Sequence, residues 1–549
     1  RDVGPWPLMR PPLPLFLAAA AAVPAVAAGG NEAVCAAGEA CPAGRAGDGV
    51  PESPHFWPSA RGHVGSYSTT HHAAPFNLSS GFSWKWYHPL GQYAVIALGV
   101  VIDKQRNVYV TGHSGILKLD EHGQEVWNYT RENTTIPIIP YLLEDSLVGG
   151  THQGTLFSLD LETGKELWVT KVAKSIAGDT AFVTAHDGII IAPTDANDVG
   201  ERNSKVTAVR ASDGAKLWSF EPAAPVWNFM ALFPGDGTVV FQDLEGRAYR
   251  LDLREGLLLW KNGGSPDTWS DGTLMLGPNG VVYAVTTLGP VVKCSIMLLK
   301  TAFCEGSVVA YRLSDGRELW RRTFDRPANA FLAVGRVAGA GGLAVVAPIG
   351  QQAAFPRFIF FFALSVFSVV LATPLALLLG LWQLRKGCSG HHCWQSMRSS
   401  CAGFALVVSA AFVLIALVLA RPPVYTSAIV VLDAETGATR WQYELPEYRQ
   451  WHTAGDDVGF GTRFGMGSRP LCLPNPFSAP TIGANGAIYF GYQDGRVYSI
   501  LDANADGSID EKSEVSTFST GTAFSSPGAA FAPGMFAIAN CDGVFAFKQ

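Results

Sequence analysis

One short pattern recurs along most of this chain and limits what the chain can fold into. Each copy is a strand of alternating residues, a polar turn with Gly, and then a Trp. Two copies read GTLFSLDLETGKELW (154–168) and SAIVVLDAETGATRW (427–441). The alternation predicts a β-strand, and the polar residues with Gly predict a tight turn. Each copy is therefore expected to form a β-hairpin that ends in a large apolar side chain.

The spacing of the copies predicts the blades of a β-propeller. Full copies end at Trp127, Trp168, Trp218, Trp260, Trp320 and Trp441. A spacing of 41 residues from Trp127 to Trp168 suits a four-stranded blade. A degenerate copy at 487–502 lacks its Trp, and the strand around Trp86 can join the strand at 543–549 to close the ring. The prediction is an all-β, eight-bladed propeller, in which these Trp residues pack between blades and do not form a ligand cage.

The repeat resembles that of the quinoprotein (PQQ) propeller family. This family includes quinoprotein alcohol dehydrogenases, the bacterial outer-membrane assembly lipoprotein BamB, and membrane-tethered eukaryotic relatives such as plant gamete-expressed proteins and the lumenal domains of ER stress sensors. The resemblance covers residues 80–350 and 424–549. It implies the fold, whereas function depends on the residues of a site.

The propeller sequence is interrupted between Trp320 and Trp441, which are 121 residues apart. The excess, residues 351–423, contains uncharged apolar runs at 358–382 and 402–420. As helices these runs would be roughly 37 and 28 Å long, so both could cross a bilayer core of about 30 Å. The alternative is a soluble buried hairpin. The link between the runs holds Arg385, Lys386 and Arg398 without an acidic residue, which predicts a cytosolic link and extracytoplasmic flanks.

The N-terminal sequence predicts secretion. Residues 1–28 contain Met9-Arg10, a short apolar stretch and small residues, as a signal peptide does, although a buried or anchoring helix is the alternative. Residues 29–79 are expected to be a flexible lead-in. The sequons at Asn77, Asn128 and Asn133 would then be glycosylated.

The nine cysteines divide in agreement with this topology. Six would lie in an oxidising compartment. Plausible pairs are Cys35–Cys41, Cys294–Cys304 and Cys472–Cys541, although six cysteines allow 15 connectivities. Cys388, Cys393 and Cys401 lie in the predicted cytosolic link, where palmitoylation, zinc binding with His391 and His392, or free thiols are the alternatives.

DANADGSID (502–510) predicts a structural calcium loop. The predicted ligands are Asp502, Asn504, Asp506, Ser508 and Asp510, at alternate positions, and Gly507 permits the sharp turn. An EF-hand needs Glu at position 12, but Ser513 is there and Glu514 comes one residue later. The loop is more similar to those of integrin-type propeller blades. A solvated acidic turn is the alternative.

Composition narrows the function. The net charge of −6 gives no general attraction to nucleic acid. The chain has no phosphate loop, no nucleophile elbow and no zinc-protease motif, and its histidines at 55–88 lack metal-ligand spacing. The favoured hypothesis is a membrane-anchored propeller on the secretory pathway or plasma membrane that binds unidentified proteins.

The sequence leaves two alternative functions. A PQQ dehydrogenase would, by the resemblance, hold the quinone on the axis with Ca²⁺, a catalytic Asp and often adjacent cysteines. This chain has no adjacent cysteines, and its calcium motif lies in a turn at a blade edge, which argues against PQQ. An ER sensor is the other alternative, although no effector domain follows the apolar runs.

Overall fold

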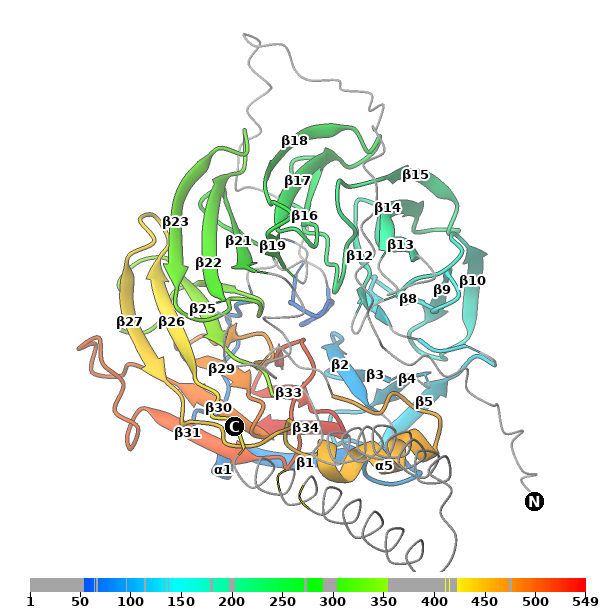
Figure 1. Cartoon of the computed structure of the whole chain (residues 1–549). Coiled ribbons are helices and arrows are strands. Elements are labelled where there is room, and N and C mark those ends of the chain that lie inside the picture. The colour runs from blue at the N-terminus through cyan, green and yellow to red at the C-terminus, as the bar shows by residue number, and fades with distance from the viewer. Residues whose placement is uncertain are drawn as a thin grey trace, which may run out of the picture.

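Eight β-sheets stand as blades around a central axis, which confirms the predicted eight-bladed propeller (Figure 1). The computed structural model describes residues 54–353 and 422–549, apart from gaps at 64, 66–67, 95, 113–114, 133, 137, 178–180, 197–202, 271–273, 290–303 and 473–475, and also the single residues 410 and 414. Within this part of the chain, no helix is both long and apolar enough to cross a membrane.

The first four blades follow one another along the chain. Blade 1 contains β2 (Ala97–Ile102), β3 (Val108–Gly112), β4 (Gly115–Leu119) and β5 (Glu125–Tyr129). Blade 2 contains β7 (Tyr141–Leu142), β8 (Ser146–Gly150), β9 (Thr155–Asp160) and β10 (Glu166–Lys171). Blade 3 contains β12 (Thr184–His186), β13 (Ile189–Ala196), β14 (Asn203–Arg210) and β15 (Lys216–Phe220), and blade 4 contains β16 (Thr238–Gln242), β17 (Arg247–Asp252) and β18 (Leu258–Gly263).

The remaining blades complete the circle. Blade 5 contains β19 (Thr268–Trp269), β20 (Leu274–Gly277), β21 (Val281–Leu288), β22 (Glu305–Arg312) and β23 (Glu318–Phe324). Blade 6 contains β24 (Ala333–Gly335), β25 (Ala344–Gly350), β26 (Ser427–Asp433) and β27 (Thr439–Glu444), and blade 7 contains β28 (Thr481–Ile482), β29 (Ile488–Gly491), β30 (Arg496–Ile500) and β31 (Val515–Ser519). Blade 8 joins β1 (Phe82–Tyr87) to β32 (Ala530–Ala532), β33 (Met535–Ala539) and β34 (Gly543–Lys548).

Among the described residues, two helices and one pair of short strands lie outside the blades. They are helix α1 (Leu78–Gly81), helix α5 (Asp456–Gly465), and the parallel pair of β6 (Ile138–Ile139) with β11 (Ala181–Phe182).

The ring is closed by strands from the two ends of the propeller sequence. β1 pairs with β34 in antiparallel fashion, with Lys85 opposite Phe545. The outermost strand of blade 8 therefore comes from residues 82–87, and its three inner strands come from residues 530–548. The sequence predicted this closure.

Trp residues join neighbouring blades in a repeated way. The Nε1 groups of Trp127, Trp168, Trp218, Trp260 and Trp320 donate to backbone carbonyls of the next blade, at 2.8–3.2 Å. Each ring also lies against the turn Gly of that blade. For example, a Cβ on Gly164 would come within 2.8 Å of the Trp127 ring, and Gly164 has a φ of +69°. Gly is thus required for its backbone conformation and for the close approach.

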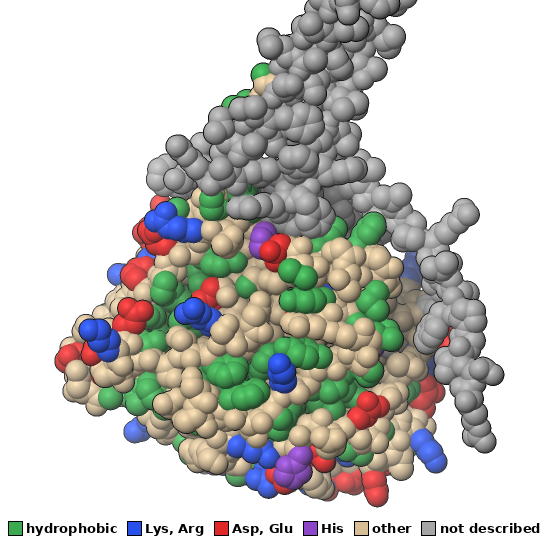
Figure 2. Space-filling model, turned by 90° about the horizontal axis from the view of Figure 1, so that it is seen from below, with side chains coloured by type: hydrophobic (Ala, Val, Ile, Leu, Met, Phe, Trp, Pro, Cys, Tyr) green, Lys and Arg blue, Asp and Glu red, His purple; other side chains and the backbone are tan. Residues whose placement is uncertain are grey.

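The same β-bulge directly precedes the Trp in each of these blades. The ladder register shifts between Glu125 and Trp127, and in the same way before Trp168, Trp218, Trp260, Trp320 and Trp441. The extra residue points outward, and several such residues are apolar and exposed: Val126, Leu167, Leu217, Leu259 and Leu319. Figure 2, which views the molecule from below, shows apolar side chains at the surface among polar ones. Bulged outer strands also resist pairing with other sheets.

The structure corrects one of these Trp assignments. The sequence placed Trp86 between blades 8 and 1, but Trp84 has that position. Trp84 Nε1 donates to the carbonyl of Glu121 at 2.9 Å, and its ring lies against Gly123. The ladder shifts between Phe82 and Trp84, which is the same bulge as in the other blades. Trp86 instead lines a cavity of about 200 Å³ together with His88, among others.

Residues 54–79 differ from the flexible lead-in predicted for 29–79. Trp57 and Arg61 are each only 1% exposed, and α1 packs beside β31 and β34. The Gly, Ala and Pro content that suggested flexibility belongs mainly to residues before 54, which lie outside the described part of the chain. The signal peptide predicted for 1–28 lies outside it as well, and so does the membrane hairpin predicted for 351–423, except for residues 351–353, 410, 414 and 422–423.

Candidate functional site

The centre of the ring is filled by the segment before β1. In Figure 1 the blue trace of this segment lies at the centre. Trp57 and Ile102 exchange two backbone hydrogen bonds of 2.9 Å, and Leu142 N donates to Pro58 O at 2.8 Å. Further along, Ile482 N donates to Ser68 O at 2.9 Å. The segment therefore contacts the innermost strands of blades 1, 2 and 7.

Arg61 is the most deeply placed charged residue of this segment. Its guanidinium carbon lies 3.4 Å from the centroid of the Phe331 ring, a cation–π contact. The Phe182 ring packs edge-on against Phe331, with centroids 5.9 Å apart. Burial lowers the pKa of Arg61 well below its ordinary value. These three side chains occupy the space between blades 3 and 6 near the axis.

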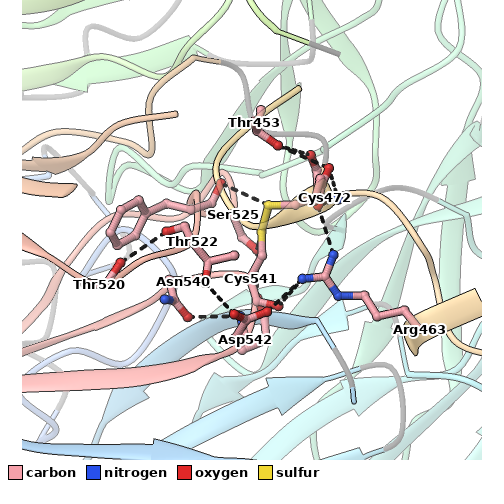
Figure 3. Close-up of a disulfide and its surroundings, with 12 residues drawn as sticks. Thr453, Arg463, Cys472, Thr520, Thr522, Ser525, Asn540, Cys541 and Asp542 are labelled. Carbon is pink, nitrogen blue, oxygen red and sulfur yellow. Dashed lines mark hydrogen bonds and ion pairs between the residues drawn. A yellow bond between two sulfur atoms is a disulfide. The ribbon is translucent and has the colours of Figure 1, made fainter. Parts of the chain in front are cut away.

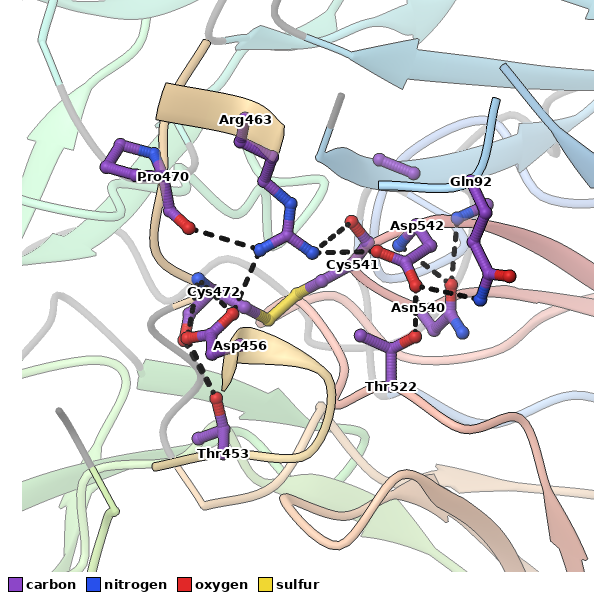
Figure 4. A network of polar contacts seen from close by, with 12 residues as sticks. Gln92, Thr453, Asp456, Arg463, Pro470, Cys472, Thr522, Asn540, Cys541 and Asp542 are labelled. Atoms are coloured by element: carbon purple, nitrogen blue, oxygen red, sulfur yellow. Dashed lines mark hydrogen bonds and ion pairs between the residues drawn. A yellow bond between two sulfur atoms is a disulfide. The ribbon is translucent and has the colours of Figure 1, made fainter. Parts of the chain in front are cut away.

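A second group of polar residues lies beside helix α5 and is fully buried (Figure 4). Arg463 Nη1 donates to Asp456 Oδ1 at 2.9 Å, and Arg463 Nη2 donates to Asp542 Oδ1 at 2.7 Å. Asp456 and Arg463 are seven residues apart, so they share the inner face of α5. Burial raises the pKa of Asp456, and the Arg463 guanidinium and the Cys472 amide offset part of that rise. The network attaches α5 to the turn between β33 and β34.

A disulfide strengthens the same attachment (Figure 3). Cys472 and Cys541 are bonded, with Cα atoms 5.9 Å apart and a sequence separation of 69. The amide of Cys472 also donates to both carboxylate oxygens of Asp456, at 3.1 Å. The sequence suggested this pair. Cys304 is disulfide-bonded as well, and its suggested partner Cys294 lies outside the described residues, as do Cys35, Cys41, Cys388, Cys393 and Cys401.

Helix α5 reverses the usual polarity of a surface helix. Its inner face carries the ion pair of Asp456 and Arg463, whereas its outer face exposes Val458 by 57% and Phe464 by 62%. Met466, directly after the helix, is 44% exposed. Asp457 is the one formally charged residue within α5 that is exposed. A helix facing water normally has charged residues on its outer face.

The insert leaves blade 6 next to this helix. The fully buried Gln493 connects the start of the insert to the segment before α5. Its Nε2 donates to Gln351 O at 3.0 Å, and Ala353 N donates to its Oε1 at 2.9 Å. Ala454 N, two residues before α5, donates to Gln493 O at 2.9 Å. On the other side of the insert, Tyr425 and Tyr448 exchange backbone hydrogen bonds of 2.9 and 3.0 Å. We call Gln351–Ala353 and Tyr425 the root of the insert.

The predicted calcium loop extends from the end of β30. Asp502 is 1% exposed; its Oδ2 accepts from Gly507 N at 3.1 Å, while its buried Oδ1 has no hydrogen-bond partner within the described residues. Asn504 and Asp506 hydrogen-bond to each other at 3.0 Å, and Ser508 N donates to Asp506. Asp510 Oδ2 accepts from Ser513 Oγ at 2.7 Å. In the described part of the chain no three His, Cys, Asp or Glu side chains stand in a metal-binding arrangement.

The Glu514 side chain points into this loop, although Glu514 lies one residue after the position that an EF-hand requires. It is 3% exposed, and its carboxylate accepts from the amides of Ala503 and Asp510 at 2.8 and 2.9 Å. The sequence did not identify Glu514 because the standard spacing excludes it. In blade 7 this loop takes the place of the short turn that accepts the Trp hydrogen bond in the other blades. Trp441 is buried, but its Nε1 therefore has no acceptor within the described residues.

The other predicted sites are less informative. Asn77 and Asn128 are exposed, as glycosylation requires, and Asn133 lies outside the described residues. Asn77 Oδ1 caps α1 by accepting from Ser80 N at 3.1 Å. The rings of His71 and His72 are in contact, with centroids 4.1 Å apart and planes tilted by 53°. Glycosylation therefore remains a prediction.

Comparisons with known proteins agree with this architecture. A family model described as outer membrane protein assembly factor BamB matches residues 84–190, 112–262 and 188–355. The chain is a β-propeller of the PQQ-type repeat family. A comparison with curated protein sequences gives no significant match.

Solved structures of this propeller type resemble the chain in fold. Quinohemoprotein alcohol dehydrogenase from Comamonas testosteroni has a TM-score of 0.54 at 12% identity, over 91% of this chain and 81% of that one. A europium-containing methanol dehydrogenase has a TM-score of 0.53 at 11% identity, over 91% and 99%. BamB from Moraxella catarrhalis has a TM-score of 0.45 at 15% identity, over 81% and 91%. The TM-scores of the two dehydrogenases show a common fold, whereas identities of 11–12% say nothing of function.

The axis of this PQQ-type propeller does not fit a quinone cofactor. The resemblance places that cofactor on the propeller axis, where this chain has its own residues 57–62 and the stacked Arg61 and Phe331. Trp57, Ser59, Ala60 and Arg61 are each no more than 3% exposed. A quinone would therefore have to displace a segment that is hydrogen-bonded to blades 1 and 2.

Proposed function

We propose that this chain is a membrane-anchored, extracytoplasmic propeller that works by binding other proteins. One observation carries the anchoring. β25 and β26 stay paired up to the insert, with Gly350 opposite Ser427, and Gln351 N donates to Thr426 O at 3.2 Å. The two ends of the insert thus lie side by side, so a hairpin of the apolar runs 358–382 and 402–420 can leave blade 6 without disturbing it.

The filled axis supports binding rather than quinone-dependent oxidation. The outer rim offers a surface to a partner, because the bulges there expose Leu167, Leu217 and Leu319. A partner can bury its own apolar side chains against these exposed residues, since exposed apolar surface often marks a protein-binding site.

The anchoring is tested by a topology map of the full chain in membranes. Glycosidase sensitivity at Asn77, Asn128 and Asn133, together with protease access to a tag inserted near residue 390, is the expected result. Unglycosylated sequons with a protected tag would invert the topology and remove the proposal.

The binding role is tested by site-specific photo-crosslinking at Leu217 and Leu319 in cells. We expect a defined protein adduct at both positions, with binding to the purified partner lost when Leu217 and Leu319 are changed to Lys. The matched control is Leu257→Lys, at an exposed position that is not a bulge residue. Oxidation of alcohols after loading with PQQ and Ca²⁺ would overturn the non-enzymatic part of the proposal.

Calcium binding by the loop 502–514 belongs to the same proposal. The orphaned Oδ1 of Asp502 and the inward carboxylate of Glu514 support it, because Ca²⁺ prefers several carboxylate and carbonyl oxygens. The expected ligands are those predicted from sequence, Asp502, Asn504, Asp506, Ser508 and Asp510, with Glu514 in addition. The ion would stabilise the loop of blade 7 that stands where the other blades have a short turn for the preceding Trp.

A further inference from the structure

We infer that the outer face of α5 lies in the surface of the lipid bilayer, so that the propeller is seated on the membrane through Val458, Phe464 and Met466. This inference rests on the proposed anchoring and adds an orientation to it. Three observations carry it: the polarity of α5, its position beside the root of the insert, and the short distances from the root to the apolar runs.

The polarity of α5 requires an apolar neighbour. Phe460 and Phe464 stack with ring centroids 6.0 Å apart, and Phe464 and Val458 are more than half exposed. The helix is held in place from behind by Arg463 and by the Cys472–Cys541 disulfide. It therefore presents these side chains rigidly, and they cannot turn inward because the inner face is occupied by the ion network. Interfacial helices bury such apolar faces at the boundary between head groups and acyl chains.

A neighbouring turn extends the same surface. Leu90 is 71% exposed and follows His88 in the turn that leads from β1 towards β2. This turn packs on α5, since a Cβ on Gly459 would come within 3.0 Å of the Tyr93 ring. Gln92 Nε2 donates to Asp542 Oδ2 at 3.4 Å and joins the turn to the ion network. We call Leu90, Val458, Phe464 and Met466 the seating surface.

The length of chain outside the described residues selects lipid as the occupant. Ala353 lies five positions before residue 358, where the first apolar run begins, and Pro422 lies two positions after residue 420, where the second run ends. Fully extended, these connections reach at most about 18 Å and 7 Å. If the runs span the bilayer, the root must lie within that distance of its surface. Because Gln493 bonds both to the root and to Ala454, two residues before α5, the start of the helix lies close to the root and so close to that surface.

The charge of the surface favours neutral lipid. Asp457 is the exposed charge within α5, and Arg463 points inward. The exposed part of α5 therefore offers no electrostatic attraction to an anionic head group. We expect an apolar contact that does not depend on anionic lipid.

The test is photo-crosslinking of the full chain in membranes that contain alkyne-tagged phosphatidylcholine. A photoreactive phenylalanine analogue replaces Leu90, Val458 or Phe464 in three separate variants. Leu167 is the matched control. Its side chain is 58% exposed, close to the 57% of Val458, and it lies on the outer strand of blade 2. We expect at least ten-fold more lipid adduct at the three sites than at Leu167, with no change when anionic lipid is added.

Two other outcomes would overturn the inference. Adducts with residues 354–421 of the same chain would mean that the insert covers the surface, and adducts with a second copy or another protein would mean a protein interface. Lipid adducts no more frequent than at Leu167 would also overturn it. The topology map separates the two proposals: a correct map with no lipid adducts leaves the anchoring intact and removes only the seating, whereas an inverted map removes both.

Discussion

Arg463 Nη2 donates to Asp542 Oδ1 at 2.7 Å, and neither side chain is exposed to solvent. This bond joins helix α5 to the turn of blade 8, between strands that close the ring. The position of α5, and therefore of the seating surface, depends on a charge pair buried between elements that are 79 residues apart in sequence.

Arg463→Met should destabilise the protein by about 3–5 kcal/mol, because it leaves the carboxylates of Asp456 and Asp542 buried without a cation. Chemical denaturation of the purified full chain measures this loss. Arg449→Met is the control, since Arg449 pairs with Glu447 at an exposed position and should cost less than about 1 kcal/mol. Equal costs for the two variants would contradict the structural role of the network.

Trp84→Ala should cost about 3 kcal/mol, because it removes both the hydrogen bond to Glu121 and the packing on Gly123. Trp86→Ala should cost about 1 kcal/mol or less, because Trp86 borders a cavity and can be replaced by water there. Thermal unfolding of the two variants decides which Trp joins blades 8 and 1. A larger loss for Trp86 would restore the assignment made from sequence.

Calcium should raise the melting temperature of the full chain, and EDTA should lower it again. With Ca²⁺ at 100 times the dissociation constant, the stabilisation would be about 2.7 kcal/mol. Asp506→Asn should abolish most of the shift, while Asp315→Asn, in an exposed turn of blade 5, should leave it unchanged. A melting temperature that does not respond to Ca²⁺ or EDTA would leave the loop as an acidic turn.

Stability should fall as the pH is lowered from about 6.5 to about 4, partly through His72. Burial, and then the neighbouring His71 and His63, lower the pKa of His72 from 6.5 to about 4. Between these values the unfolded chain binds a proton on His72 that the folded chain does not, so lower pH favours unfolding. Because the ring is only half buried, solvent screens part of this effect, and the loss should be about 1 kcal/mol.

Unfolding of His72→Gln at pH 7 and pH 5 measures that contribution. The variant should lose less stability than the wild type over this range, and His122→Gln, at an exposed position, should behave like the wild type. The same pH dependence in all three proteins would show that His72 does not contribute.

Sequence reasoning found the fold because each blade repeats the same local chemistry. The turn Gly comes four residues before the Trp in copies such as Gly164–Trp168 and Gly437–Trp441. This fixed spacing makes each copy of the repeat recognisable in the sequence. In blade 8 the Trp strand is far in sequence from its hairpin partner, and FSWKW offers two Trp residues. Only the bulge between Phe82 and Trp84 distinguishes them, and a bulge depends on the paired strand.

The sites were harder to predict because they depend on contacts between distant segments. Nothing near Arg61 indicates that it stacks on Phe331, 270 residues later. Asp456 and Asp457 are adjacent acids, a pattern typical of an exposed loop, yet Asp456 is buried by its contacts with Arg463 and Cys472. The calcium motif was visible because its ligands are local, whereas Glu514 was excluded by a spacing rule taken from a different fold.

The pairing of β1 with β34 has a consequence for biogenesis. Residues 82–87 leave the ribosome long before residues 543–548, so blade 8 cannot form until almost the whole propeller has been synthesised. Until then the nascent chain is an open arc of blades with apolar interfaces exposed at both ends. Under the proposed topology, we expect chaperones of the extracytoplasmic compartment to hold this arc while the apolar runs insert into the membrane, because contacts of such long sequence separation form slowly.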